Sequence, residues 1–279
     1  MTETLITLPL DSLTREYPVI TPEELQDSWQ AYTGRFDKPH TTAELLGAAY
    51  MPQEQPKAFV SIDLCEVVRH TCASLWALEQ PFGTPIANVH AYGADMELIQ
   101  GDDDKITAYI TALMNNGLVR EMEGIDDMAT LARGWREQGI YTFANTSTLP
   151  GCEEATVRFL AERMMGSLDA ILFPRNYGNV AGIMNKGVAA RLLIEQCMEP
   201  FPTPDERAIP VLHIDDVPYH HQAFRKEVTT LPYADVRTFQ PLYPSEYESD
   251  HHSTLSPTPL GAFRAMDAHL FDRGILGSK

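Results

Sequence analysis

The segment "KAFVSIDLCEVVRHT" (residues 57–71) decides the fold, because it opens with a short apolar run that ends at an aspartate, Asp63. Short apolar runs bounded by polar residues are typical of strands buried in a sheet. Ligands of open α/β sheets bind outside the carboxyl ends of such strands, so Asp63 stands where chemistry is expected. Cys65 follows two residues later, and a thiol at this edge needs an explanation.

Three later segments repeat the pattern of a short apolar strand, and each follows a helical pattern. The strands are predicted at 140–147, 169–174 and 209–216, after the helical segments "MATLARGWREQG", "GCEEATVRFLAERMMG" and "NKGVAARLLIEQCM". Gly139 ends the first of these helices in the usual way. The alternation of helices with short apolar strands predicts an α/β fold with a parallel sheet and helices on both faces.

The chain divides into a predicted core and three additions to it. The core takes in residues 56–66 and 125–226, which hold the strands. Residues 67–124 are far more than one crossover needs and carry two helical patterns, which predicts a helical cap over the carboxyl ends of the strands. Residues 1–55 contain a helix-start signal and predict an N-terminal helical arm. Residues 227–279 are rich in Pro, Ser and Tyr and predict a C-terminal extension that ends in a helix.

Composition excludes several classes of partner. The net charge of −18, from 39 acids and 21 bases, argues against a nucleic-acid polymer as partner. No apolar run approaches the roughly 20 residues of a membrane span, and the first residues lack a secretory pattern, so a cytoplasmic protein without a membrane partner is expected. The four cysteines form no CxxC pair, which favours reduced thiols. A small phosphorylated molecule stays compatible with the acidic charge, because local cations or a metal override the overall field.

Polar side chains gather at the ends of the predicted elements. Their positions are Asp63, Thr146 with Ser147, Lys186, and Asp215 with Asp216. Because the carboxyl ends of parallel strands share one edge, these side chains are expected to lie together. A carboxylate nucleophile, a hydroxyl donor, a lysine and an acidic pair are what phosphoryl transfer through an aspartyl intermediate requires.

The order of these groups over residues 57–226 resembles the four motifs of the haloacid dehalogenase (HAD) superfamily. Within it, the insertion after the first motif, the run "LVREMEGIDDMATLARGWREQGIYTFANTS" and the ending "HIDDVP" look most like 5′(3′)-deoxyribonucleotidases. The resemblance implies a Rossmann-like core, a helical cap, a Mg²⁺ cofactor, and attack by Asp63 on the phosphorus of a small phosphomonoester. It also implies that Asp63, the Asp215–Asp216 pair and the backbone carbonyl of Cys65 bind the metal.

Cys65 departs from the family pattern, because family phosphatases usually carry a second aspartate there as the general acid. General acid–base help is worth typically ~10²–10⁴-fold in rate, and a thiol of ordinary pKa, about 8.5, replaces a carboxylic acid poorly. Three alternatives follow. The protein is a specialised phosphatase that uses Glu66 or a cap residue as acid, a dehalogenase-like hydrolase that needs no acid, or a catalytically impaired binding or regulatory protein.

Single residues also have plainer interpretations. Asp63 alone is compatible with a helix cap, and Lys186 with a first-turn surface lysine that buries little, in which case Arg175 would supply the positive charge to the substrate. Thr146 is preferred over Ser147 as the phosphate-binding hydroxyl, although a hydroxyl at a first helical turn is also a common N-cap. At least one of the two adjacent aspartates near 215 is predicted to bind the metal.

Overall fold

The computed structural model describes residues 46–49, 51–65, 67–70, 120–147, 153–164, 166–174, 186–205, 208–242 and 249–277. The helix predicted near residue 21, the helices of the predicted cap, Glu66 and Arg175 lie outside these residues. Among the helices described, none is both long and apolar enough to cross a membrane.

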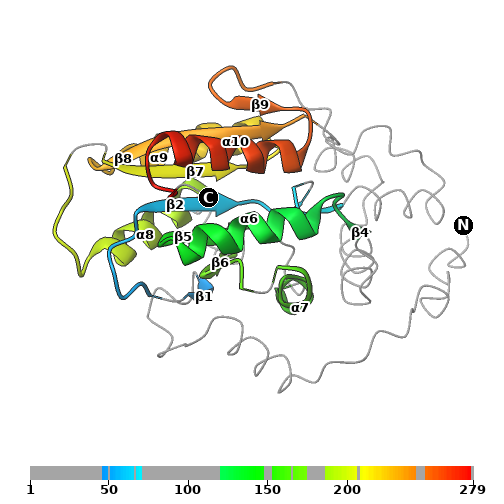
Figure 1. The fold of residues 1–279 in the computed structure, drawn as a ribbon, viewed down its shortest axis with the longest axis horizontal. Helices are drawn as coiled ribbons and strands as arrows, with labels where there is room; N and C mark the ends of the chain where they lie inside the picture. Colours follow the sequence, from blue (N-terminus) through cyan, green and yellow to red (C-terminus); the bar gives the residue numbers. More distant parts are fainter. Residues whose placement is uncertain are drawn as a thin grey trace, which may run out of the picture.

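A seven-stranded sheet forms the centre of the molecule, with strand order β1-β6-β5-β2-β7-β8-β9 (Figure 1). Its strands are β1 (Leu46–Ala49), β2 (Ala58–Ile62), β5 (Ile140–Asn145), β6 (Ala170–Leu172), β7 (Ile209–Ile214), β8 (Ala234–Pro241) and β9 (Thr254–Ser256). The six strands β6, β5, β2, β7, β8 and β9 run parallel to one another, and β1 pairs antiparallel with β6 at one edge. The first strand of the core, β2, therefore lies between β5 and β7. A separate two-stranded sheet joins β3 (Arg69–His70) to β4 (Arg120–Glu121).

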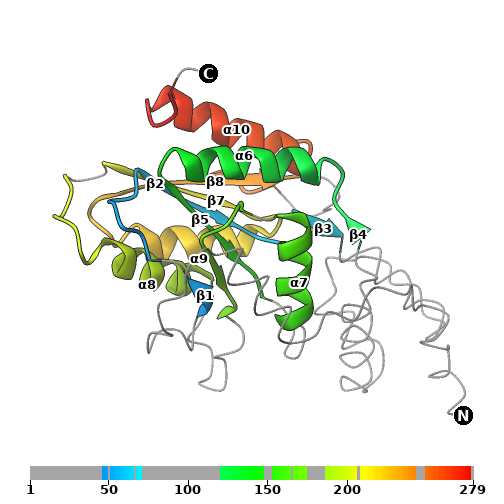
Figure 2. The ribbon, with the colours of Figure 1, turned by 60° about the horizontal axis from the view of Figure 1, so that its bottom comes forward.

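Helices cover both faces of the sheet, as the sequence predicts. They are α6 (Ile125–Glu137), α7 (Glu153–Arg163), α8 (Lys186–Met198), α9 (Pro218–Val228) and α10 (Pro259–Asp272). Figure 2 shows α6 and α10 on one face and α8 and α9 on the other. The two buried clusters agree with this division, since one contains residues of α6 and α10 and the other residues of α8 and α9. The predicted α/β, Rossmann-like architecture is confirmed.

The sequence of β2 explains its central place. All five of its residues are buried, and Val60 and Ile62 pack in the cluster with α6 and α10, whereas Phe59 packs in the cluster with α8 and α9. Side chains alternate between the faces of a strand, so a strand covered on both sides must be apolar at every position. The run "AFVSI" meets this requirement except at Ser61, whose hydroxyl lies 3.0 Å from His213 Nδ1 of β7.

A close helix contact fixes the start of α8. A Cβ atom added to Gly187 would lie 2.2 Å from the backbone oxygen of Ala223 in α9. No side chain fits at that distance, so glycine allows α8 and α9 to approach at this point. Because Gly187 directly follows Lys186, this contact also fixes the position of the Lys186 backbone.

Two predicted boundaries are corrected. The core does not end at residue 226, because β8 and β9 extend the same sheet from β7, and α10 packs on it. The described residues of the range 227–279 are therefore part of the core. The sequence did not indicate this, because Pro, Ser and Tyr dominate the composition between residues 241 and 258. Likewise, residues 46–49 of the predicted helical arm 1–55 form a strand that pairs with β6.

Candidate functional site

Two neighbouring strands end in aspartates. β2 pairs with β7 so that Ile62 lies beside Ile214, and the N–H of Asp63 donates to the backbone oxygen of Ile214 at 3.0 Å. Asp63 and the Asp215–Asp216 pair thus leave the sheet side by side. All three carboxylates are buried, and one oxygen from each lies within 4.8 Å of the others. The structure therefore brings together the acids that the sequence predicted.

Lys186 joins this acidic cluster. Its Nζ lies 2.7 Å from Asp63 Oδ1 and 2.7 Å from Asp215 Oδ2, and its side chain is 2% exposed. Burial by itself lowers the pKa of the ammonium group, but the two carboxylates outweigh it and hold that pKa above its ordinary value. The lysine is thus charged and buried, which corrects the expectation of a surface residue that buries little. The helix start reaches so far inward because Gly187 lets α8 approach α9.

Asp215 is surrounded by donors. The N–H of Val217 donates to its Oδ1 at 2.9 Å, Lys186 contacts its Oδ2, and His220 Nδ1 lies 3.0 Å from both oxygens. Burial raises the pKa of this carboxyl, but His220 and Lys186 outweigh burial and hold the pKa well below its usual range. Asp215 is therefore ionised, and its oxygens are directed at the lysine and the histidine.

The pKa of Asp63 depends on a different balance between burial and neighbouring charges. Burial is the largest influence and raises the pKa of Asp63 to about 6, although the ammonium of Lys186 opposes the rise. The neighbouring Asp215 adds to the rise by charge repulsion. At neutral pH most Asp63 carboxyl groups are still ionised, so the group is able to act as a nucleophile once a phosphoryl group is present.

Thr146 stands at the same edge. β5 lies beside β2 with Ala144 paired to Ile62, so Thr146 leaves the sheet next to Asp63. The threonine is fully buried, and its N–H donates to the backbone oxygen of Leu172 at 3.1 Å. Ser147 is half-buried. Just before them, the amide of Asn145 donates to the backbone oxygen of Lys186 at 3.0 Å and so ties β5 to the start of α8.

Cys65 is held by an arginine that the sequence analysis did not single out. After Asp63 the chain turns back, with the N–H groups of Val68 and Arg69 both donating to the backbone oxygen of Leu64 at 3.0 Å. This turn carries Arg69 Nη2 to 3.6 Å from Cys65 Sγ, while Nη1 donates to Thr156 Oγ1 at 3.1 Å. Arg69 is 2% exposed. The thiol two residues after Asp63 is therefore in contact with a buried cation.

A group of histidines supports the end of β7, and few features of the sequence indicated it. His213 Nδ1 lies 3.0 Å from Ser61 Oγ of β2, and the imidazole stacks on Phe224 with ring centroids 4.1 Å apart. His221 Nε2 lies 2.8 Å from the backbone oxygen of Asp215. Burial lowers the pKa of His213 and lowers that of His221 to about 3, so both are neutral at pH 7. The one sequence signal was a histidine inside an apolar strand.

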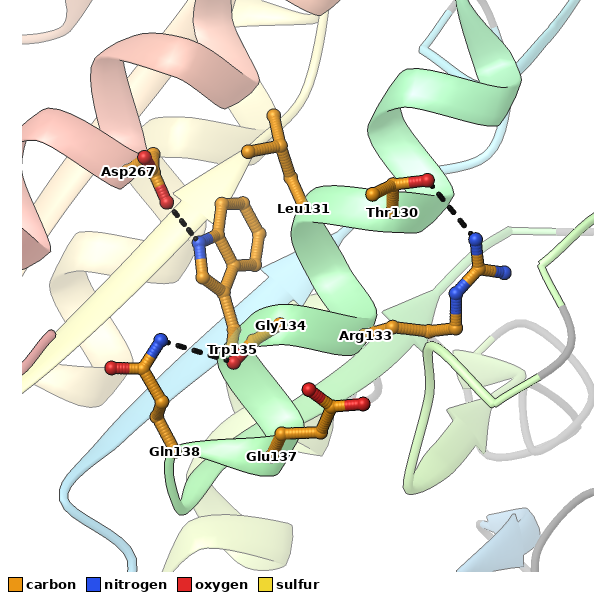
Figure 3. Close-up of a pocket in the computed structure, with 8 residues that line it drawn as sticks. All are labelled: Thr130, Leu131, Arg133, Gly134, Trp135, Glu137, Gln138 and Asp267. Atoms are coloured by element: carbon orange, nitrogen blue, oxygen red, sulfur yellow. Dashed lines mark hydrogen bonds between the residues drawn. The ribbon is translucent and has the colours of Figure 1, made fainter. Parts of the chain in front are cut away.

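A pocket of about 300 Å³ lies away from this cluster, along α6 (Figure 3). Its lining includes Leu131 and Trp135 of α6 and Asp267 of α10, and the indole Nε1 of Trp135 donates to Asp267 Oδ1 at 2.9 Å. No candidate site residue that the structure describes belongs to its lining. The pocket marks the junction of α6 and α10, and it is distinct from the strand-end site.

Comparison with known proteins identifies the fold. A Thermotoga maritima protein assigned as a beta-phosphoglucomutase superposes with a TM-score of 0.50 at 13% identity, over 76% of this chain and 99% of that chain. This chain shares the α/β fold of that protein. No family model matches the chain, and no curated protein sequence matches it significantly.

Two other solved structures are similar to a lower degree. CbbY from Rhodobacter sphaeroides, solved with xylulose-1,5-bisphosphate, has a TM-score of 0.45 at 13% identity over 72% of this chain and 94% of that chain. A HAD-like hydrolase of Xanthomonas campestris has a TM-score of 0.40 at 12% identity over 80% of this chain and 100% of that chain. The α/β, Rossmann-like core predicted from the sequence is confirmed as a fold, and the resemblance to the HAD superfamily and to its deoxyribonucleotidases stays a prediction.

Proposed function

We propose that the chain is a Mg²⁺-dependent phosphomonoester hydrolase that works through an aspartyl-phosphate on Asp63. The observation that carries the proposal is the position of Lys186 Nζ, 2.7 Å from both Asp63 and Asp215 inside a buried acidic cluster. A buried ion pair of this kind is poor evidence of stabilisation, because desolvation offsets most of the attraction. It does, however, hold a cation beside the carboxylate on which phosphoryl charge would develop.

The side chains of the cluster suit a magnesium ion. Three buried carboxylates face a single ammonium group, so a divalent cation would offset the remaining negative charge. Hard oxygen ligands are also the ones that Mg²⁺ prefers. We assign the ion to Asp63, Asp216 and the backbone carbonyl of Cys65, because the oxygens of Asp215 are already engaged by Lys186, His220 and Val217. When bound, Mg²⁺ would offset phosphoryl charge and polarise the phosphorus for attack.

The residues of the chain divide the reaction between them. The Asp63 carboxylate forms a bond to phosphorus as the ester P–O bond breaks, and water then hydrolyses the acyl phosphate and restores the carboxylate. Lys186 offsets the charge shared by Asp63 and the phosphoryl group, and Thr146 donates to a phosphoryl oxygen. Ser147 and Arg175 remain candidates for further substrate contacts. The leaving oxygen takes its proton from Glu66 or from a residue of the predicted cap.

The contact between Cys65 and Arg69 favours a second candidate, a binding protein without turnover. A thiol beside a buried guanidinium supplies no carboxylic acid at the position where family phosphatases carry one. Such a protein would retain the acidic cluster and Lys186 and would bind a small phosphorylated molecule without hydrolysing it.

Phosphate release separates the candidates. The purified protein is assayed with Mg²⁺ against p-nitrophenyl phosphate and nucleoside monophosphates, with Asp63→Asn as the matched control. Release by the wild type that Asp63→Asn abolishes supports the hydrolase. If no phosphate appears while a phosphomonoester raises the melting temperature, the chain is a binding protein. Halide released from a haloacid without metal would instead indicate a dehalogenase.

A further inference from the structure

Tyr219 is an exposed aromatic residue beside the candidate site. It lies in the first turn of α9, three residues after Asp216, and its side chain is 62% exposed. Pro218 at the start of the helix and the bond from the N–H of Val217 to Asp215 fix the backbone that carries it. The ring is therefore held at a defined position while much of its surface faces outward.

A short chain of contacts joins this ring to the nucleophile. The Tyr219 ring meets the imidazole of His220 edge to face, with centroids 4.3 Å apart and planes at 70°. His220 Nδ1 lies 3.0 Å from Asp215, which contacts Lys186, which in turn contacts Asp63 at 2.7 Å. Three side chains thus separate the exposed ring from the carboxylate of Asp63. The ring stands at the rim of the strand-end site.

The charge of the site limits what could lie against this ring. Lys186 and the proposed Mg²⁺ together offset the three carboxylates of the cluster, so a bound phosphomonoester leaves the site negative and a second anionic group on the substrate would be repelled at the rim. A neutral flat group would meet no such penalty. It would also gain from stacking on an aromatic face that loses little conformational entropy when it is covered.

We propose that Tyr219 determines substrate specificity by stacking on a flat aromatic group in the alcohol part of the phosphomonoester, such as the base of a nucleoside monophosphate. The inference rests on the proposed function, since the phosphoryl group has to sit at Asp63 for the base to reach the rim. Tyr219 takes no part in the bond-making steps. Its contribution is to the affinity for substrates that carry a ring.

The test compares two substrates in three variants. The substrates are adenosine 5′-monophosphate, which carries a base, and glycerol 3-phosphate, which does not. Tyr219→Leu removes the ring, Tyr219→Phe keeps it, and Phe271→Leu is the matched control, because Phe271 is 51% exposed on α10, on the opposite face of the sheet. Tyr219→Leu should lower kcat/KM for the nucleotide by about 10- to 100-fold and leave glycerol 3-phosphate within about twofold.

The two variants that keep the Tyr219 ring or alter a distant one serve as controls. Tyr219→Phe and Phe271→Leu should retain the wild-type preference for the nucleotide. An equal loss on both substrates in Tyr219→Leu would show that the ring only positions His220, and no loss on either would show that the ring contacts no substrate; both results overturn the proposal.

A binding measurement keeps this test separate from the proposed hydrolysis. If the wild type releases phosphate from neither substrate, the proposed function fails, and stacking is then judged by calorimetric titration with adenosine alone. Weaker adenosine binding by Tyr219→Leu than by wild type and Phe271→Leu supports the stacking role. Equal binding by all three proteins, or no binding by any, overturns it.

Discussion

Replacing Lys186 should have large effects on both the activity and the stability of the protein. Lys186→Met would leave the carboxylates of Asp63 and Asp215 buried without their shared cation. We expect phosphate release to fall to background and the free energy of unfolding to fall by about 3–5 kcal/mol, the usual result of removing one partner of a buried pair. Urea unfolding and phosphate release measure the two effects.

The matched control for this variant is Lys57→Met, since Lys57 is an exposed lysine just before β2. Its unfolding free energy should change by no more than about 0.5 kcal/mol. Unchanged stability in Lys186→Met would contradict the ion pairs of the acidic cluster.

Cys65→Asp tests whether a carboxylic acid at this position would raise the rate. The introduced carboxyl would lie near Arg69, whose guanidinium would hold it ionised at neutral pH. The rate gain on adenosine 5′-monophosphate should therefore stay below the ~10²–10⁴-fold of a well-placed acid. It should increase between pH 8 and pH 5.5, as more of the carboxyl is protonated.

The leaving group and a matched variant complete this test. The gain should be smaller for p-nitrophenyl phosphate, whose leaving group departs without a proton, and absent in Cys65→Ser. A large gain that does not change with pH would show that Arg69 does not control the carboxyl at this position.

His221 makes stability depend on pH. Burial lowers its pKa from 6.5 to about 3, so between these values the unfolded chain binds a proton that the folded protein does not. The contribution of the neutral His221 to the free energy of unfolding is complete above pH 6.5 and is lost as the pH falls toward 3. Between pH 7.5 and pH 5.0 the wild type should lose about 2 kcal/mol more stability than His221→Gln.

The difference between the two proteins isolates the effect of His221. Both proteins contain Asp63, whose pKa is raised from 3.8 to about 6, so its effect on stability has the opposite sign between these pH values but is the same in both proteins. Urea midpoints at the two pH values give the comparison. Equal losses in wild type and His221→Gln would mean that His221 is not buried in its neutral form.

At the scale of elements, the close contact between α8 and α9 at Gly187 gives the sharpest prediction. In Gly187→Ala the new Cβ would lie 2.2 Å from the backbone oxygen of Ala223, so the helices must separate. We expect a loss of about 1–3 kcal/mol in unfolding free energy and a lower kcat, because Lys186 moves with α8. Chemical denaturation and steady-state kinetics on the same preparation measure both.

Gly134→Ala supplies the control, since a Cβ there meets nothing within 4 Å among the described residues. This glycine lies in the middle of α6, where alanine should stabilise the protein by about 0.5–1 kcal/mol. A loss in Gly187→Ala no greater than the change in Gly134→Ala would show that the close helix contact is not a constraint.

Local patterns were sufficient for the elements of the core. The apolar runs of β2, β5, β6 and β7 and the amphipathic pattern of α6 are properties of neighbouring residues, so each could be predicted where it stands. The side chains at the ends of these strands followed from the shared edge of a parallel sheet. The contact of Arg69 with Cys65 and the burial of Lys186 depend on a turn and on a helix approach, which no local pattern reports.

For the whole molecule, we expect the C-terminal strands and helix to unfold together with the rest of the core. Phe263 of α10 is fully buried and stacks on Trp135 of α6 with centroids 5.6 Å apart. Phe263→Ala should lower the free energy of unfolding by about 3–5 kcal/mol. The single transition should be retained, with coincident midpoints by Trp135 fluorescence and far-ultraviolet circular dichroism.

Fluorescence is assigned to Trp135 by replacing Trp29 and Trp76 with phenylalanine. Phe271→Ala, at an exposed aromatic of the same helix, should change the stability little. A separate early fluorescence transition in the protein that keeps only Trp135 would mean that α10 unfolds on its own. The predicted boundary at residue 226 failed for the same reason that this test is needed. β8 is held in the sheet by pairing with β7, β9 by pairing with β8, and α10 packs on the same core, none of which a local sequence pattern reports.

The central place of β2 also sets the order in which a growing chain completes its site. β2 is the first parallel strand to be synthesised, yet its neighbours β5 and β7 come much later, and β7 is not finished until residue 214. Until then the strand that carries Asp63 has an open edge, and pairings of such long separation form slowly. A nascent chain that ends after β6 already holds Asp63 and Thr146 but neither Lys186 nor Asp215. The acidic cluster therefore closes only when most of the protein has left the ribosome.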